Sequence, residues 1–169
     1  LPGEAEIARV GDRLAGHLPG DVDLAPLYGR LTTPEQDQAI QPAKPGRRKV
    51  VLATAIAQTS LTIEGVRVVV DGGWARLPAY DPATGFTALE TRRVSRAAAD
   101  QRRGRAGRTE PGVCYRLWAA TQEGALAPFD PPEILAADLT GLALDLASWG
   151  ISDPSALAFP SPPPVAAWA

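Results

Sequence analysis

The sequence has no methionine and no asparagine, and it has only one cysteine and one histidine among its 169 residues. A lone cysteine, Cys114, excludes an internal disulfide and is typical of a protein from the reducing cytoplasm. No apolar run approaches the roughly 20 residues needed to cross a bilayer, so we expect a cytoplasmic protein with no membrane partner. Because the chain also lacks an initiating methionine, we expect it to be a fragment of a longer protein.

Lysine is scarce as well, and arginine carries most of the positive charge. The chain has two lysines and 15 arginines, and all 17 basic residues lie within residues 1–116 beside 13 acidic residues. Residues 117–169 hold six acidic residues and no basic ones. The first part is therefore expected to contact phosphate groups, and the acidic tail is expected to belong to a second structural unit.

Apolar periodicity predicts strands that alternate with helices. Strands are expected over 22–29, 48–57, 66–73 and 112–118, helices over 3–18, 33–40, 95–108 and 131–150, and a protruding β-hairpin over 75–94. The runs at 48–57 and 66–73 are typical of strands covered on both faces. Thr33 is the expected N-cap of the second helix. This order indicates an α/β fold with a parallel sheet, whose ligands bind at the carboxyl ends of the strands.

The segment QRRGRAGR, residues 101–108, combines four arginines with two glycines. In a continuous helix Gln101, Arg105 and Arg108 share one face. Two guanidinium groups and an amide on that face can grip the terminal oxygens of a nucleoside triphosphate. Arg102 and its neighbour then point elsewhere, toward solvent or nucleic acid.

The two glycines of this segment need their own explanation, because glycine inside a helix costs about 1 kcal/mol relative to alanine. We expect Gly104 and Gly107 to let a phosphate chain or a facing domain approach the helix backbone. The alternative, a solvated arginine-rich helix, leaves the glycines unexplained.

A loop rich in hydroxyl groups follows the run at 48–57. Thr54, Ser60 and Thr62 are placed to bond phosphate or ribose oxygens, and Glu64 could accept a hydrogen bond from a ribose hydroxyl. Helix capping is the alternative role for these hydroxyls. The chain lacks a G-x-x-x-x-G-K-[ST] loop and an Asp–Glu pair after a strand, so another domain would have to supply the floor of any triphosphate site.

The stretches LATAIAQTSLTIEGVRVVVDGG (52–73) and RVSRAAADQRRGRAGR (93–108) closely resemble motifs V and VI of the DEAH-box helicases of superfamily 2. PGRRKVVLAT, DPATGFTALE and GVCYRLW are most similar to the bacterial HrpB type. The resemblance implies a RecA-like, P-loop-NTPase-type parallel sheet flanked by helices, with an inserted β-hairpin. By this likeness residues 1–125 form the second RecA-like lobe without its first strand. Residues 126–169 would be a linker and the start of a winged-helix domain.

The resemblance also implies roles in ATP hydrolysis. Gln101 would position the attacking water, Arg105 would contact phosphate, and Arg108 would be the arginine finger. Ser60 would link the nucleotide to the bound strand, while Thr62 and Glu64 would face the ribose. The implied cofactor is ATP with Mg²⁺, the metal being held mainly by the first RecA-like lobe, which is the implied partner.

Single-stranded RNA or DNA is the other implied partner. The expected nucleic-acid contacts are Thr54 and Ala55 after the first long strand, Arg76, Arg92 and Arg93 of the hairpin, and Arg102. The chain departs from the family at Ala55, where relatives carry asparagine, and at Gln58, where they carry glutamate.

Two functions follow from these residues. The first is the C-terminal motor lobe of an ATP-dependent helicase, which we expect to be inactive as an isolated fragment. The second is a non-enzymatic module that binds RNA through its arginines. A Rossmann-type dehydrogenase is excluded because no glycine fingerprint opens the α/β unit.

Overall fold

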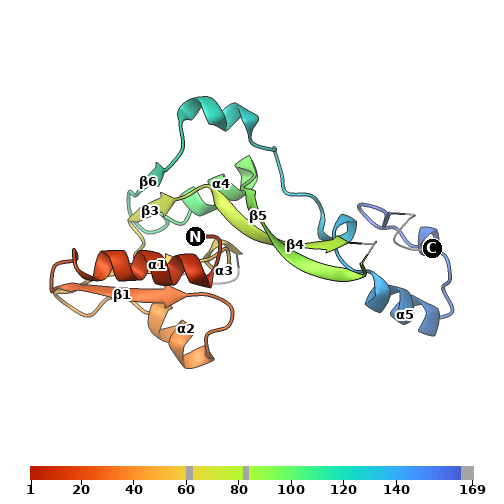
Figure 1. The fold of residues 1–169 in the computed structure, drawn as a ribbon, viewed down its shortest axis with the longest axis horizontal. Coiled ribbons are helices and arrows are strands. Elements are labelled where there is room, and N and C mark those ends of the chain that lie inside the picture. The colour runs from red at the N-terminus through yellow and green to blue at the C-terminus, as the bar shows by residue number, and fades with distance from the viewer. Residues whose placement is uncertain (60–62, 82–83, 165–169) are drawn as a thin grey trace. The chain divides into compact units, whose positions relative to one another are not determined.

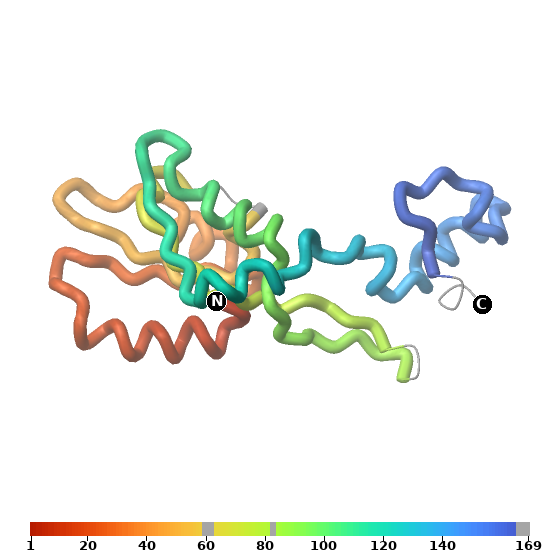
Figure 2. The backbone as a smooth tube through the Cα atoms, turned by 90° about the horizontal axis from the view of Figure 1, so that it is seen from above, coloured from red at the N-terminus to blue at the C-terminus, as the bar shows by residue number. Residues whose placement is uncertain are grey.

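The computed structural model describes residues 1–59, 63–81 and 84–164 of the chain. It divides into two compact units, one of Leu1–Arg76 with Thr91–Phe129 and the other of Leu77–Glu90 with Asp130–Ala169. Within the described part of the chain, no helix is long and apolar enough to span a membrane. Figures 1 and 2 show the course of the chain.

The first unit contains a pair of parallel strands, β1 (Val22–Leu27) and β2 (Arg48–Ala53), with Val22 opposite Arg48. Helix α1 (Glu4–Ala15) packs on both strands, because a side chain at Gly11 would lie 3.7 Å from Leu24 on β1 and 3.7 Å from Leu52 on β2. Leu27 is fully buried. The predicted strands and helix are thus confirmed, although β2 ends four residues earlier than expected.

Helix α2 (Thr33–Ile40) connects the two strands and begins with a capping box. The Glu35 carboxylate accepts hydrogen bonds from the Thr32 N–H at 2.8 Å and from the Thr32 hydroxyl at 2.7 Å. The prediction that Thr33 is the N-cap is wrong by one residue. Threonine occupies both positions, and Thr32 lies three residues before the acidic side chain that completes the box.

A second parallel pair consists of β3 (Val68–Asp71) and β6 (Val113–Arg116), with Val68 opposite Val113. The side chains that share one face are exposed: Val68 and Val70 on β3 are 56% and 62% accessible, and Tyr115 on β6 is 57% accessible. The expectation that the run at 66–73 is covered on both faces is therefore wrong for the described chain. An apolar run shows that a strand can be buried, but a neighbouring element must be present to bury it.

The predicted hairpin is confirmed as β4 (Trp74–Asp81) and β5 (Phe86–Arg93), which pair in a two-stranded sheet. Its two strands run side by side in both views of the chain (Figures 1 and 2). At its base the Arg93 guanidinium lies 5.1 Å from the centre of the Trp74 ring and 5.4 Å from that of Trp118. Gly73 has φ +74°, and a side chain there would come within 2.8 Å of Trp118, so only glycine fits this base.

The C-terminal residues form short helices rather than one long helix. Two 3₁₀ turns, Ala120–Ala125 and Glu133–Leu135, precede α5 (Thr140–Ser148), and a third, Pro154–Ala156, follows it. The prediction of a continuous helix over 131–150 is wrong for its first half. The Asp138 carboxylate accepts from the Thr140 N–H at 2.9 Å, and this local bond starts the helix at Thr140 instead.

Candidate functional site

Helix α4 (Arg96–Arg103) carries the arginine-rich segment and begins where the sequence predicts. Ser95 is the N-cap: its buried hydroxyl accepts a hydrogen bond from the Ala98 N–H at 3.1 Å. Ala98 and Ala99 are buried, 5% and 0% accessible, and α4 packs against β3. The N-cap Ser95 therefore fixes where α4 begins, and the small side chains of Ala98 and Ala99 let one face of the helix pack closely against β3.

The end of α4 differs from the prediction, because the helix does not continue to residue 108. Gly104 is the C-cap, and its N–H donates to the Asp100 carbonyl at 2.9 Å. Gly107 has φ +87°, and Gly112 passes so close that a side chain on it would lie 2.6 Å from the Gly107 nitrogen. The glycines therefore end the helix and turn the chain back toward β6. Admitting a phosphate to the side of a helix is not needed to explain them.

Gln101, Arg105 and Arg108 consequently do not share one helix face. Gln101 lies in the last turn of α4, Arg105 lies just after the C-cap, and Arg108 lies beyond the left-handed Gly107. Gln101 and Arg108 are exposed, and Arg105 is partly buried. All three residues still lie at or just after the C-terminal end of α4, where the chain turns back toward β6.

Gln58 brings two of these residues together. It lies in α3 (Ile56–Thr59), the short helix that follows β2. The Gln58 side-chain Nε2 donates to Gln101 Oε1 at 2.9 Å, and the Gln58 carbonyl accepts a hydrogen bond from Arg105 Nη2. Gln101 and Arg105 therefore lie next to the carboxyl end of a parallel strand, where α/β folds bind their ligands.

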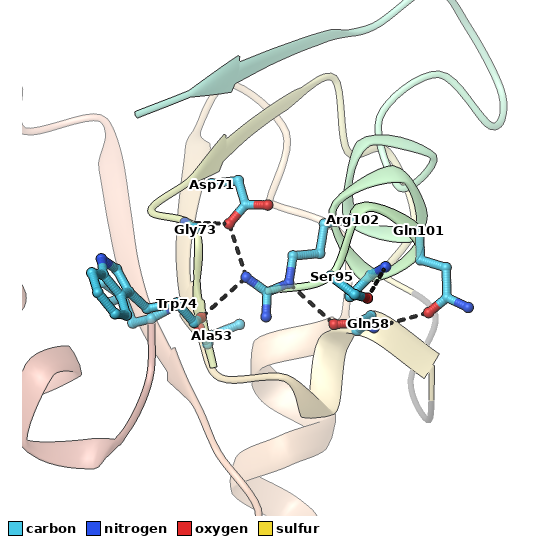
Figure 3. A network of polar contacts seen from close by, with 10 residues as sticks. Ala53, Gln58, Asp71, Gly73, Trp74, Ser95, Gln101 and Arg102 are labelled. Carbon is cyan, nitrogen blue, oxygen red and sulfur yellow. Dashed lines mark hydrogen bonds and ion pairs between the residues drawn. The ribbon is translucent and has the colours of Figure 1, made fainter. Parts of the chain in front are cut away.

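Arg102 does not point to solvent or to nucleic acid, and that prediction is wrong. Its side chain is 13% exposed, and its Nη1 lies 2.8 Å from Oδ1 of Asp71, whose side chain is 2% exposed. Arg102 also donates to Gln58 Oε1 at 3.1 Å and to the Trp74 carbonyl at 3.2 Å (Figure 3). Arg102 and Asp71 therefore form a structural ion pair, and this pair joins α4 to the end of β3.

Positive charge is concentrated at Arg105 and Arg108. Burial lowers the pKa of the Arg105 guanidinium from its ordinary value, and the nearby charge of Arg108 lowers it further. In the described part of the chain, Arg108 has no ion-pair partner. An anion between these two groups would relieve their repulsion, so this end of α4 is suited to bind a phosphate.

Two further arginines predicted to contact nucleic acid are engaged by other side chains of the chain. Arg76 lies 3.5 Å from the Glu6 carboxylate of α1, and Arg93 is stacked between two tryptophan rings. Arg92 is exposed. Thr54 and Ala55 follow β2, and the Thr54 N–H donates to the Leu27 carbonyl at 3.1 Å, which continues the β1–β2 ladder.

Four further residues were predicted to contact the nucleotide. Ser60 and Thr62 lie outside the described residues. Glu64 is exposed in a turn before β3, and Gly104 is occupied as the helix cap. Among the residues that are described, no group of three or more histidine, cysteine or carboxylate side chains is arranged to hold a metal ion.

Two members of this site were not predicted as site residues. The sequence shows Gln58 only as a departure from the family pattern, and Asp71 lies within the strand predicted over 66–73. Asp71 is 3% exposed, and its Oδ2 has no hydrogen-bond partner in the described chain. A carboxylate that is buried at the end of an apolar run needs a cation, and Arg102 is that cation.

Residues 6–110 match the family described as the helicase conserved C-terminal domain. The chain is 52% identical over 165 residues to the ATP-dependent RNA helicase HrpB of Escherichia coli, covering 98% of this chain and 20% of that protein. It is 43% identical over 169 residues to the human probable ATP-dependent RNA helicase DHX34, covering 98% of this chain and 15% of that protein.

A solved structure agrees with these matches. The crystal structure of the Escherichia coli DEAH/RHA helicase HrpB superposes with a TM-score of 0.92 at 51% sequence identity, covering 99% of this chain and 21% of that chain. The chain therefore spans about one fifth of the length of the HrpB proteins that it matches.

Proposed function

Because the chain belongs to the helicase conserved C-terminal domain family, we propose that it is the C-terminal motor lobe of an ATP-dependent RNA helicase. The observation that carries this proposal is the position of Arg105 and Arg108 at the end of α4, beside the loop that follows β2. Burial lowers the pKa of the Arg105 guanidinium from its ordinary value, and the charge of Arg108 lowers it further. Such a pair is suited to the spread negative charge of a phosphoryl group in transfer.

The proposed site is shared between two lobes. This chain supplies Gln101, Arg105 and Arg108, and a first RecA-like lobe supplies the phosphate-binding loop. When bound, Mg²⁺ would neutralise phosphate charge, and residues of that first lobe would hold it. Arg105 contacts a phosphate oxygen, and Arg108 stabilises the charge that develops as the γ-phosphate bond breaks.

The loop that follows β2 also connects the proposed site of ATP hydrolysis to the bound RNA. Thr54 begins the segment that ends at Gln58, so a nucleic-acid backbone held at Thr54 lies four residues from the contacts of Gln101 and Arg105. Closing of the two lobes on ATP and their separation after hydrolysis would move this contact along a single strand. We propose Thr54 and the exposed Arg92 as the RNA contacts of this lobe.

A non-enzymatic RNA-binding module is disfavoured. Such a module would need several available arginines on one surface, but Arg102 is held by Asp71 and Arg93 by two tryptophan rings.

The proposed function is tested by ATP hydrolysis of the full-length protein with and without single-stranded RNA. We expect RNA to increase the rate of hydrolysis, because a motor couples the two ligands through one lobe interface. Single-stranded DNA of the same sequence serves as the comparison. A protein that binds RNA in a salt-dependent way but hydrolyses no ATP would contradict the proposal and favour the binding module.

A further inference from the structure

Tryptophan and arginine side chains alternate in a stack at the base of the hairpin. The Arg93 guanidinium lies 5.1 Å from the centre of the Trp74 ring and 5.4 Å from that of the Trp118 ring. The Arg116 guanidinium lies 5.6 Å from the centre of the same Trp118 ring. The stack therefore consists of Trp74, Arg93, Trp118 and Arg116 in that order, and each neighbouring pair makes a cation–π contact.

The two ends of this stack differ. At one end Arg116 is held by ion pairs, because its Nη2 lies 2.7 Å from Asp100 Oδ1 and its Nη1 donates to the Glu123 carboxylate. At the other end the Trp74 ring is the outermost member, and Trp74 is 43% exposed. An indole ring is stabilised by leaving water, so an exposed ring at the end of a stack is suited to bind a further flat group.

Trp74 is held in one orientation before any ligand binds. Its carbonyl accepts a hydrogen bond from Arg102 Nη1 at 3.2 Å. The Val94 N–H donates to the Gly73 carbonyl at 3.1 Å, and this bond closes the base of the hairpin beside Trp74. Arg93 lies against the ring itself. A side chain that is already oriented loses little conformational freedom when a ligand stacks on it.

Trp74 lies beside the loop that we propose to hold RNA. The Arg102 guanidinium contacts both the Trp74 carbonyl at 3.2 Å and Gln58 Oε1 at 3.1 Å. Gln58 belongs to the segment that begins at Thr54, so one side chain joins the first residue of the hairpin to this loop. Figure 3 shows that the Trp74 ring points away from Gln101, and therefore away from the proposed phosphate site.

We propose that the exposed face of the Trp74 ring is a stacking site for a base of the single-stranded RNA. This inference rests on the proposed function, and it adds a contact to a base where Thr54 would contact the backbone. Every base has a flat π face, so stacking on Trp74 is tolerant of sequence. That tolerance suits a motor that moves along RNA.

The first test measures the affinity of the full-length protein for a single-stranded RNA oligonucleotide without nucleotide. Trp74→Leu keeps an apolar side chain but removes the ring, so Kd should rise by about 5- to 150-fold, the range for one stacked base. Trp74→Phe keeps a flat ring and should recover most of this loss. Trp149→Leu makes the same change at a 73% exposed tryptophan of the other unit, and it should leave Kd unchanged. A Kd for Trp74→Leu within about twofold of the unsubstituted value would overturn the proposal.

The dependence of Kd on salt separates stacking from a change in charge. Stacking neutralises no phosphate, so the slope of log Kd against log salt concentration should be the same in Trp74→Leu as in the unsubstituted protein. If Trp74 served only to hold Arg93 against a phosphate, removal of the ring would reduce this slope by about one. A slope reduced in this way would overturn the proposal and assign the RNA contact to Arg93.

Tryptophan fluorescence provides a test that does not depend on a loss of affinity. A base stacked on an indole ring quenches its emission, so saturating RNA should quench the unsubstituted protein more than it quenches Trp74→Phe. Equal quenching of the two proteins would overturn the proposal. Quenching by ATP alone that disappears in Trp74→Phe would also overturn it, because the base on the ring would then be that of the nucleotide.

This inference and the proposed function fail in different ways. RNA-stimulated ATP hydrolysis by the unsubstituted protein, together with unchanged RNA affinity in Trp74→Leu, would refute the stacking site and leave the motor function standing. RNA binding that depends on Trp74, in a full-length protein that hydrolyses no ATP, would support the stacking site and refute the motor function.

Discussion

Replacing Arg108 with alanine in the full-length protein should reduce RNA-stimulated ATP hydrolysis by about 10³- to 10⁵-fold, the contribution of an arginine finger. Arg108 lies beyond Gly107 in an exposed turn and has no ion-pair partner among the described residues, so its guanidinium group is available to a ligand. Its charge matters most when negative charge develops in the transition state, so ATP binding should change by only a few-fold. Steady-state hydrolysis and a nucleotide titration measure the two quantities separately.

Arg103→Ala is the matched control for this variant. Arg103 is also an exposed arginine of the same segment, with 62% of its side chain accessible and a surface ion pair to Asp100 at 3.4 Å. Surface pairs of this kind contribute about 0–1 kcal/mol, and we expect nearly unchanged hydrolysis. Hydrolysis by Arg108→Ala that stays within about 10-fold of the unsubstituted rate would exclude the finger role.

The second large effect is expected from Arg102→Ala, and it concerns stability. Removing Arg102 leaves the Asp71 carboxylate buried and unpaired, with one oxygen that already lacks a hydrogen-bond partner in the described chain. Breaking a buried ion pair from one side costs about 3–5 kcal/mol. Because α4 and β3 are joined by this pair, the cost should appear as local opening of these two elements.

Hydrogen–deuterium exchange of the full-length protein measures this opening directly. Amides of Val68–Asp71 and of Arg96–Arg103 should exchange about 100-fold faster or more in Arg102→Ala, since 1.4 kcal/mol corresponds to a factor of ten. The double variant Asp71→Asn/Arg102→Ala removes the orphaned charge and should recover part of the protection. Unchanged exchange in Arg102→Ala, or no recovery in the double variant, would contradict the role assigned to this pair.

Much of the fold follows from local signals in the sequence. The apolar runs that became β2 and β3, the hairpin, and the start of α4 at Ser95 each depend on a few consecutive residues. The end of α4 was not predicted, because glycine is both a tolerated interior residue and the usual helix terminator. Here α4 ends at the C-cap Gly104, and the left-handed Gly107 follows three residues later, where Gly112 passes close to it.

The site was predicted less completely than the fold, for a related reason. Gln101, Arg105 and Arg108 were selected from the sequence, but the contacts that orient them join residues far apart in the chain. Gln58 and Gln101 are 43 positions apart. Asp71 and Arg102 are 31 positions apart. Pairing at such separations depends on tertiary packing, so sequence periodicity could not show that Arg102 faces inward.

A structure of the full-length protein with RNA, ADP and aluminium fluoride would show whether Arg105 and Arg108 grip a phosphate held by another lobe. Aluminium fluoride stands in for the γ-phosphoryl group in transfer, with its fluorides at the positions of the equatorial oxygens. We expect guanidinium nitrogens of both arginines to lie at about 3 Å from these fluorides. Arginines that make no contact with the aluminium fluoride in a closed, RNA-bound complex would contradict the claim.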